Sequence, residues 1–350
     1  MEILIVKLSA IGDVVHTLPA LNAIRRHYPD ARITWLIEEA AAPLVVGHEA
    51  LDRVIVSRRR TWMKRIASSP GAVLAEVRDF LRQLRDTEYD VILDFQGLLK
   101  SGILVALARG RRKIGFGRGM QHQECSYIFL NEPVPAVDME IHALVRYLKM
   151  LEPLGISENE EISYNIPVSE SDRQWASRVL EDAGRGKGTG VAALNPAAKW
   201  ETKLWLPERF AALADAITDR YGMPVLFTGG SEDRSDIDKI TSLMKNSAVN
   251  LAGKTSLTRL AALYEGVAVV VTTDTGPMHI AAAVNAPVVA LFGPTAPWRT
   301  GPFGNNNRVL RGMPDCSPCF KRSCDTVECM AQIGVDDVLG AVEELCPGII

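Results

Sequence analysis

The fold is decided by residues 269–283, which read VVVTTDTGPMHIAAA. Three consecutive valines begin a strand without a polar face, and strands of this kind are buried on both sides in parallel sheets. A short polar turn follows, and a helix is predicted to begin near Gly276 and Pro277, because proline suits the first turn of a helix. A strand, a turn and a helix in this order form the repeating unit of an α/β fold.

The same unit recurs along the chain, where short apolar runs alternate with amphipathic stretches. The predicted strands are 3–6, 33–37, 54–56, 91–94, 191–194, 225–228, 267–272 and 288–292. The pattern begins again after a glycine-rich stretch at 182–190, which we interpret as a loop before a second sheet. We therefore expect two doubly wound, Rossmann-like α/β domains, 1–165 and 166–350, facing across a ligand-binding cleft. The last predicted helix, 335–345, could pack back on the first domain.

Composition excludes several classes of protein. The 350 residues are 47% hydrophobic and 23% charged, which is typical of a soluble globular chain. The net charge of −3 argues against bulk binding of nucleic acid. No apolar run reaches the ~18–20 residues that span a bilayer, and the N-terminus is typical of a strand rather than a signal peptide. We expect a cytoplasmic protein, with its six cysteines as thiols or metal ligands.

The turn at the end of the 269–283 strand is a candidate anion site. Exposed N–H groups and the helix dipole attract phosphate at a helix N-terminus. Thr275 can add a hydroxyl, and His279 lies one turn into the helix. Alternatively, Asp274 or Thr275 only caps the helix and His279 is a buried polar residue. We favour the phosphate site, because several polar groups converge at the carboxyl end of a strand.

A second candidate site follows the first strand, at residues 7–19, KLSAIGDVVHTLP. It has one glycine where the dinucleotide fingerprint needs three, which argues against an NAD-dependent dehydrogenase. Asp13 follows Gly12 and is interpreted as pointing into the cleft, although aspartate is also a good helix cap. A helix that began at Asp13 would hold Pro19 beyond its first turn, so Thr17 is an alternative cap.

Four separated motifs give the chain its resemblance to a known family. They are 7–19 KLSAIGDVVHTLP, 94–101 DFQGLLKS, 203–207 KLWLP and 274–279 DTGPMH. In this order they resemble glycosyltransferase family 9, the heptosyltransferases of the lipopolysaccharide inner core, over nearly the whole chain. Residues 35–39 and 96–101 look more like the members that add the first heptose to Kdo.

The resemblance implies a GT-B fold, with the acceptor in the first domain and ADP-heptose in the second. It implies an inverting transfer of heptose to the Kdo/lipid A inner core with no required cofactor. By similarity, Asp13 looks like the general base and Lys203 like the cation on the donor diphosphate. The other implied donor-site residues are Asp274, Thr275, Gly276, His279 and, more weakly, Glu232.

This chemistry suits the residues present. An acceptor hydroxyl must lose its proton as it attacks, which calls for one positioned carboxylate. The departing diphosphate gains negative charge, which a helix N-terminus and Lys203 can stabilise. The pair Asp236 and Asp238 falls inside a predicted helix, so it does not form a metal-binding Asp-x-Asp at a strand end. Taken alone, Lys203 could be an ordinary surface lysine.

A basic cluster follows the predicted strand 54–56. Arg59, Arg60 and Lys64 are candidate ligands for an anionic glycolipid acceptor. The same cluster could touch the inner membrane, because anionic lipids attract basic residues. A solvated run of charge is the alternative.

Four cysteines lie close together in the sequence, at Cys316, Cys319, Cys324 and Cys329. This spacing could hold zinc or an iron–sulfur cluster, but we favour reduced thiols. The cluster looks more like family members that add the second heptose. The alternatives are therefore a second-heptose enzyme, a family 9 transferase with another acceptor or sugar, and a non-catalytic nucleotide-sugar-binding protein.

Overall fold

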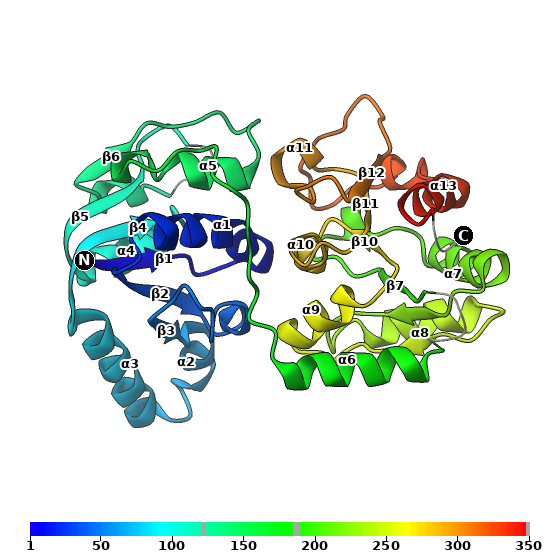
Figure 1. The fold of residues 1–350 in the computed structure, drawn as a ribbon, viewed down its shortest axis with the longest axis horizontal. Coiled ribbons are helices and arrows are strands. Elements are labelled where there is room, and N and C mark those ends of the chain that lie inside the picture. Colours follow the sequence, from blue (N-terminus) through cyan, green and yellow to red (C-terminus); the bar gives the residue numbers. More distant parts are fainter. Residues whose placement is uncertain (121–123, 185–189, 348–350) are drawn as a thin grey trace. The chain divides into compact units, whose positions relative to one another are not determined.

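The computed structural model describes residues 1–120, 124–184 and 190–347 (Figure 1). Its contacts divide the chain into a first unit, Met1–Pro167, and a second unit, Val168–Ile350. Residues 185–189 of the glycine-rich loop lie outside the described residues. No helix in the described part of the chain is both long enough and apolar enough to cross a membrane.

The first unit contains a parallel six-stranded sheet in the order β3-β2-β1-β4-β5-β6 (Figure 1). Its strands are β1 (Glu2–Val6), β2 (Arg32–Glu38), β3 (Arg53–Ser57), β4 (Glu88–Asp94), β5 (Arg109–Phe116) and β6 (Glu132–Val134). Its helices are α1 (Ile11–His27), α2 (Arg59–Arg65), α3 (Pro70–Arg85), α4 (Leu99–Leu107) and α5 (Ala143–Lys149). The strand order reverses between β1 and β4, and in open α/β sheets ligands bind at such a reversal.

The second unit contains another parallel six-stranded sheet, in the order β12-β11-β10-β7-β8-β9. Its strands are β7 (Ala192–Asn195), β8 (Val225–Phe227), β9 (Val249–Asn250), β10 (Val269–Thr273), β11 (Val288–Phe292) and β12 (Asn307–Arg311). Its helices are α6 (Glu170–Asp182), α7 (Pro207–Tyr221), α8 (Arg234–Leu243), α9 (Leu257–Glu265), α10 (Gly276–Ala283), α11 (Pro297–Thr300), α12 (Glu328–Ala331) and α13 (Val335–Leu345). Here the order reverses between β7 and β10.

The apolar runs form the centres of both sheets, as their sequence predicts. The β1 residues Ile3–Val6 and the β10 residues Val269–Val271 are completely buried, because strands covered on both faces must be apolar throughout. Helix α13 adds Val338 and Val342 to the core of the second unit and contacts α7, β11 and β12. Both sheets are doubly wound, and the predicted fold class is confirmed.

Helix α1 differs from its prediction. It begins at Ile11, with Ala10 as its N-cap, and carries Pro19 in its interior, so neither Asp13 nor the alternative Thr17 is the N-cap residue. The hydroxyl of Thr17 donates to the carbonyl of Asp13 one turn earlier, at 2.7 Å. Proline destabilises a helix interior but does not forbid it. The apolar side chains of this helix are mostly buried, and the helix packs against α5.

Candidate functional site

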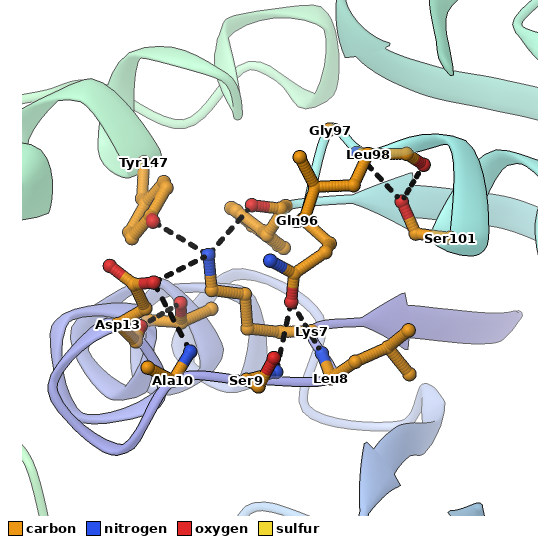
Figure 2. Close-up of polar contacts among 12 residues, drawn as sticks. Lys7, Leu8, Ser9, Ala10, Asp13, Gln96, Gly97, Leu98, Ser101 and Tyr147 are labelled. Atoms are coloured by element: carbon orange, nitrogen blue, oxygen red, sulfur yellow. Dashed lines mark hydrogen bonds and ion pairs between the residues drawn. The ribbon is translucent and has the colours of Figure 1, made fainter. Parts of the chain in front are cut away.

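The candidate base lies beside the reversal point of the first sheet (Figure 2). Asp13 lies in the first turn of α1, the helix that follows β1, and its side chain is 41% exposed. Its Oδ2 accepts a hydrogen bond from the N–H of Ala10 at 3.2 Å. The carboxylate thus stabilises the start of the helix from its first turn, not as the N-cap residue that the alternative expected, since that residue is Ala10. It is still open to solvent.

A buried lysine, which the sequence did not single out, lies next to this carboxylate. Lys7, the residue after β1, is 2% exposed. Its Nζ donates to the hydroxyl of Tyr147 at 2.7 Å and to the carbonyl of Phe95 at 3.0 Å, and it lies 4.0 Å from Oδ2 of Asp13. Burial lowers the pKa of Lys7, but Tyr147 and Asp13 outweigh it and raise this pKa above its usual value. The lysine is therefore charged at neutral pH.

The loop after β4 fixes the loop after β1. Oε1 of Gln96 accepts hydrogen bonds from the N–H groups of Leu8 and Ser9, at 3.0 and 2.9 Å (Figure 2). Asp94, at the end of β4, accepts from the hydroxyl of Ser101 at 3.0 Å. Burial raises the pKa of Asp94 to about 6. The motif 94–101 therefore supports the segment that carries Asp13.

Two other predicted residues, Lys203 and Asp274, lie close together at the reversal point of the second sheet, between β7 and β10. Nζ of Lys203, in the segment after β7, lies 2.6 Å from Oδ2 of Asp274, which follows β10. The hydroxyl of Thr295, after β11, donates to the same oxygen at 2.6 Å. Lys203 is 14% exposed and its Nζ lies 4.5 Å from the ring centre of Trp200. The sequence analysis did not single out Thr295 or Trp200.

Helix α10 begins beside this ion pair. Its N-cap is Thr275, whose side chain makes no capping hydrogen bond, and Asp274 is committed to Lys203 and Thr295. Thr275 holds the N-cap position and His279 is buried, as the capping alternative expects, but the Thr275 side chain makes no capping hydrogen bond. Gly276 opens the helix and His279, 7% exposed, lies one turn in. The first-turn N–H groups and Nζ of Lys203 together suit an anion.

Glu232 occupies a separate loop of the second unit. It follows β8, the strand that neighbours β7 on the other side from β10. Its side chain is exposed and accepts a hydrogen bond from the hydroxyl of Ser231 at 3.3 Å. The loop thus belongs to the same edge of the sheet as Lys203.

The basic cluster surrounds a buried carboxylate in the first unit. Glu38, the last residue of β2, has a 6% exposed side chain. It lies 3.6 Å from Arg59, 3.6 Å from Arg60 and 3.0 Å from Lys100. Three cations around one anion leave a surplus of positive charge, and Lys64 is exposed on the same helix as the arginines. The sequence did not predict Lys100 as part of this cluster.

A pocket of about 190 Å³ opens beside the cluster. It is lined by Glu38, Glu39, Ala40, Ser57, Arg58 and Arg60. Nζ of Lys100 also donates to the hydroxyl of Ser9, at 3.0 Å, in the loop that leads to Asp13. The basic cluster and the candidate base thus belong to one continuous region of the first unit.

The four clustered cysteines are all free thiols. Cys316 and Cys324 are exposed, Cys319 is half-buried and Cys329 is buried. Burial raises the pKa of Cys329, whereas hydrogen bonds from the backbone of Val327 and Thr326 lower that of Cys324. Within the described residues, no three or more His, Cys, Asp or Glu side chains are grouped so as to hold a metal ion.

Comparison with known proteins identifies the family. The model of glycosyltransferase family 9 (heptosyltransferase) matches residues 77–329. The lipopolysaccharide heptosyltransferase 1 of Pseudomonas aeruginosa is 31% identical over 93% of this chain and 87% of its own length.

Solved structures agree with the sequence comparison. The Escherichia coli heptosyltransferase WaaC with ADP has a TM-score of 0.80 at 28% identity, over 99% of this chain and 100% of its own. The same enzyme with ADP-2-deoxy-2-fluoro heptose has a TM-score of 0.77 at 28% identity, over 98% of this chain and 99% of its own. The expected GT-B fold is confirmed by this likeness. This chain belongs to glycosyltransferase family 9, the heptosyltransferases, and is a glycosyltransferase.

Proposed function

We propose that this chain transfers L-glycero-D-manno-heptose from ADP-heptose to the Kdo of the Kdo/lipid A inner core, as a heptosyltransferase I. The observation that carries the proposal is the full-length likeness to an enzyme solved with ADP and with a fluorinated ADP-heptose. The relative in Pseudomonas, named lipopolysaccharide heptosyltransferase 1, supports the choice of acceptor. The runner-up is addition of the second heptose.

In the proposed reaction the second unit holds the donor. The first turn of α10, with Thr275 and Gly276, receives the diphosphate, and Lys203 provides a cation held in place by Asp274. His279 faces the donor from the second turn, and Glu232 binds the ribose hydroxyls. Fixed dipoles and a fixed cation stabilise the charge that develops on the departing ADP. These groups take the part that a bound metal plays in other transferases, so no cofactor is required.

In the same reaction Asp13 is the general base. It accepts the proton of the acceptor hydroxyl while the hydroxyl oxygen attacks the anomeric carbon and the bond to the diphosphate breaks. One displacement inverts the anomeric configuration, and a single carboxylate suffices because no covalent sugar intermediate forms. The exposure of Asp13 suits a group that must meet an external substrate.

The basic cluster binds the anionic acceptor in this proposal. We expect the triple variant Arg59→Gln, Arg60→Gln, Lys64→Gln to raise the acceptor KM about tenfold or more, since charged hydrogen bonds contribute about 1.5–3 kcal/mol each. The Kd for ADP-heptose should not change, and neither constant should change in Arg111→Gln, a control on an arginine that is 70% exposed in the same unit. A weakened donor Kd with a normal acceptor KM would contradict the assignment.

A lipid-linked acceptor also suggests where the enzyme works. We infer that it acts at the cytoplasmic face of the inner membrane, in peripheral contact through the basic helix α2. Anionic headgroups attract such residues with about 1 kcal/mol per charge.

One assay distinguishes the alternatives. The protein is incubated with ADP-heptose and a panel of truncated core acceptors, with and without a chelator, and the products are read by mass spectrometry. The proposal predicts one added heptose on acceptors that end in Kdo, whether or not the chelator is present. Transfer only to acceptors that already carry a heptose would favour the second-heptose enzyme, and donor binding without turnover would favour a binding protein.

A further inference from the structure

Lys7 is a buried charge for which the proposed reaction has no role. An ammonium group loses its hydration when it is buried, and the cost is several kcal/mol unless well-placed partners replace the water. Lys7 is 2% exposed and yet remains charged, because Tyr147 and Asp13 raise its pKa. A residue that serves only to fill space at the end of β1 could be apolar at lower cost.

The position of this charge is fixed from two sides. The hydroxyl of Tyr147, on α5, accepts one N–H of Lys7 (Figure 2). The carbonyl of Phe95, after β4, accepts another. Nζ also lies 4.6 Å from the centre of the Tyr147 ring, in range of a cation–π contact. An ammonium has three protons, and the remaining one is available to the carboxylate of Asp13, whose Oδ2 is 4.0 Å away.

The other acid near Lys7 has its own partners. Asp94 accepts hydrogen bonds from the backbone of Gln96 and Gly97 and from the hydroxyl of Ser101. Burial nevertheless raises the pKa of Asp94 to about 6, and Lys7 is the smallest of the influences named for it. The ion-pair contact of Lys7 is with Asp13.

Both contacts of the Asp13 carboxylate engage the same oxygen. The N–H of Ala10 donates to Oδ2, and Lys7 faces Oδ2 (Figure 2). A carboxylate held by one oxygen has a defined orientation, and its other oxygen can then be presented to a substrate.

We propose that Lys7 is a positioning residue for the transfer reaction: it fixes Oδ2 of Asp13 so that Oδ1 faces the acceptor hydroxyl. The inference rests on the proposed function, in which Asp13 is the base. The acceptor proton passes to Oδ1, the acceptor oxygen bonds to the anomeric carbon, and the electron pair of the broken bond leaves with ADP. Lys7 keeps its own protons throughout, and it touches neither substrate.

A double-mutant cycle separates this role from a purely structural one. In the wild-type background we expect Lys7→Met to lower kcat about 10- to 100-fold, with little change in the KM of either substrate, since a misplaced base costs rate rather than binding. In the Asp13→Asn background the same change should alter the residual rate less than about twofold. A residue that only supports the fold would lower both rates by the same factor.

Two further variants keep the test decisive if Lys7→Met folds poorly. Tyr147→Phe leaves the charge but removes one of its anchors, and we expect a smaller loss of kcat that also disappears in the Asp13→Asn background. Lys113→Met is the control. The pKa of Lys113 is lowered by burial, and no charged partner is among the causes. The kcat of this variant should therefore be unchanged.

Equal losses in both backgrounds, or a normal kcat for Lys7→Met and Tyr147→Phe, would overturn the inference while leaving Asp13 as the base. Normal turnover of Asp13→Asn alone would instead remove the base from the proposed function, and the role of Lys7 with it.

Discussion

Asp13→Asn is expected to lower kcat for heptose transfer about 10³-fold, in the middle of the range for loss of a general base. Asparagine has nearly the same shape and its amide oxygen can accept the hydrogen bond from the N–H of Ala10, so the fold and thermal stability should be preserved. The Kd for ADP-heptose should be unchanged, since the proposed donor site belongs to the second unit. Steady-state kinetics measure the loss of kcat. Calorimetric titration with ADP-heptose checks the unchanged Kd, and a thermal melt checks the unchanged stability.

The matched control for this variant is Asp79→Asn. Asp79 is an exposed aspartate of the same unit, on α3, paired with Arg82, and exposed pairs of this kind contribute about 0–1 kcal/mol. Its kcat should equal that of the wild type. Near-normal turnover in Asp13→Asn would show that another group removes the acceptor proton.

Lys203→Ala is expected to weaken donor binding and to slow the chemical step together. The change removes a cation and leaves the carboxylate of Asp274, 7% exposed, without a counter-charge, since its other partner, the hydroxyl of Thr295, is neutral. A buried unpaired carboxylate then repels the diphosphate, so we expect kcat/KM for ADP-heptose to fall about 100-fold or more. Titration with ADP and with ADP-heptose separates the loss of binding from the loss of rate.

A second substitution identifies the cause of that loss. Adding Asp274→Asn to Lys203→Ala should recover part of the affinity for ADP, because the unpaired charge is removed. Lys239→Ala, at a lysine of α8 whose side chain is 72% exposed, should behave as the wild type. Unchanged donor affinity and rate in Lys203→Ala would end its assignment as the diphosphate cation.

Strands could be predicted from the sequence where burial on both faces requires apolar residues. The eight predicted strands are all present, because each contains a short apolar run; seven of them lie inside a sheet, and β3 lies at an edge. The sequence missed β5, β6, β9 and β12, which lie at or next to sheet edges. β9 has only two residues, and β5 carries several charged residues in the run RGRRKIGF. Edge strands need no apolar second face, so their periodicity is weak.

The candidate site was predictable only in part. Asp13, Lys203 and Asp274 follow strands in short motifs, and local sequence marks that position. Their partners come from elsewhere: Tyr147 is 140 residues from Lys7, and Thr295 is 21 residues from Asp274. Contacts of this kind depend on strand order, which a single sequence does not encode locally.

The anomeric configuration of the transferred heptose tests the single displacement most directly. Nuclear magnetic resonance of the product formed from ADP-heptose and a Kdo-terminated acceptor reports both the configuration and the sugar to which heptose is attached. Displacement by an acceptor hydroxyl that Asp13 deprotonates predicts a configuration opposite to that of the donor, with heptose on Kdo. A product that retains the donor configuration would contradict it.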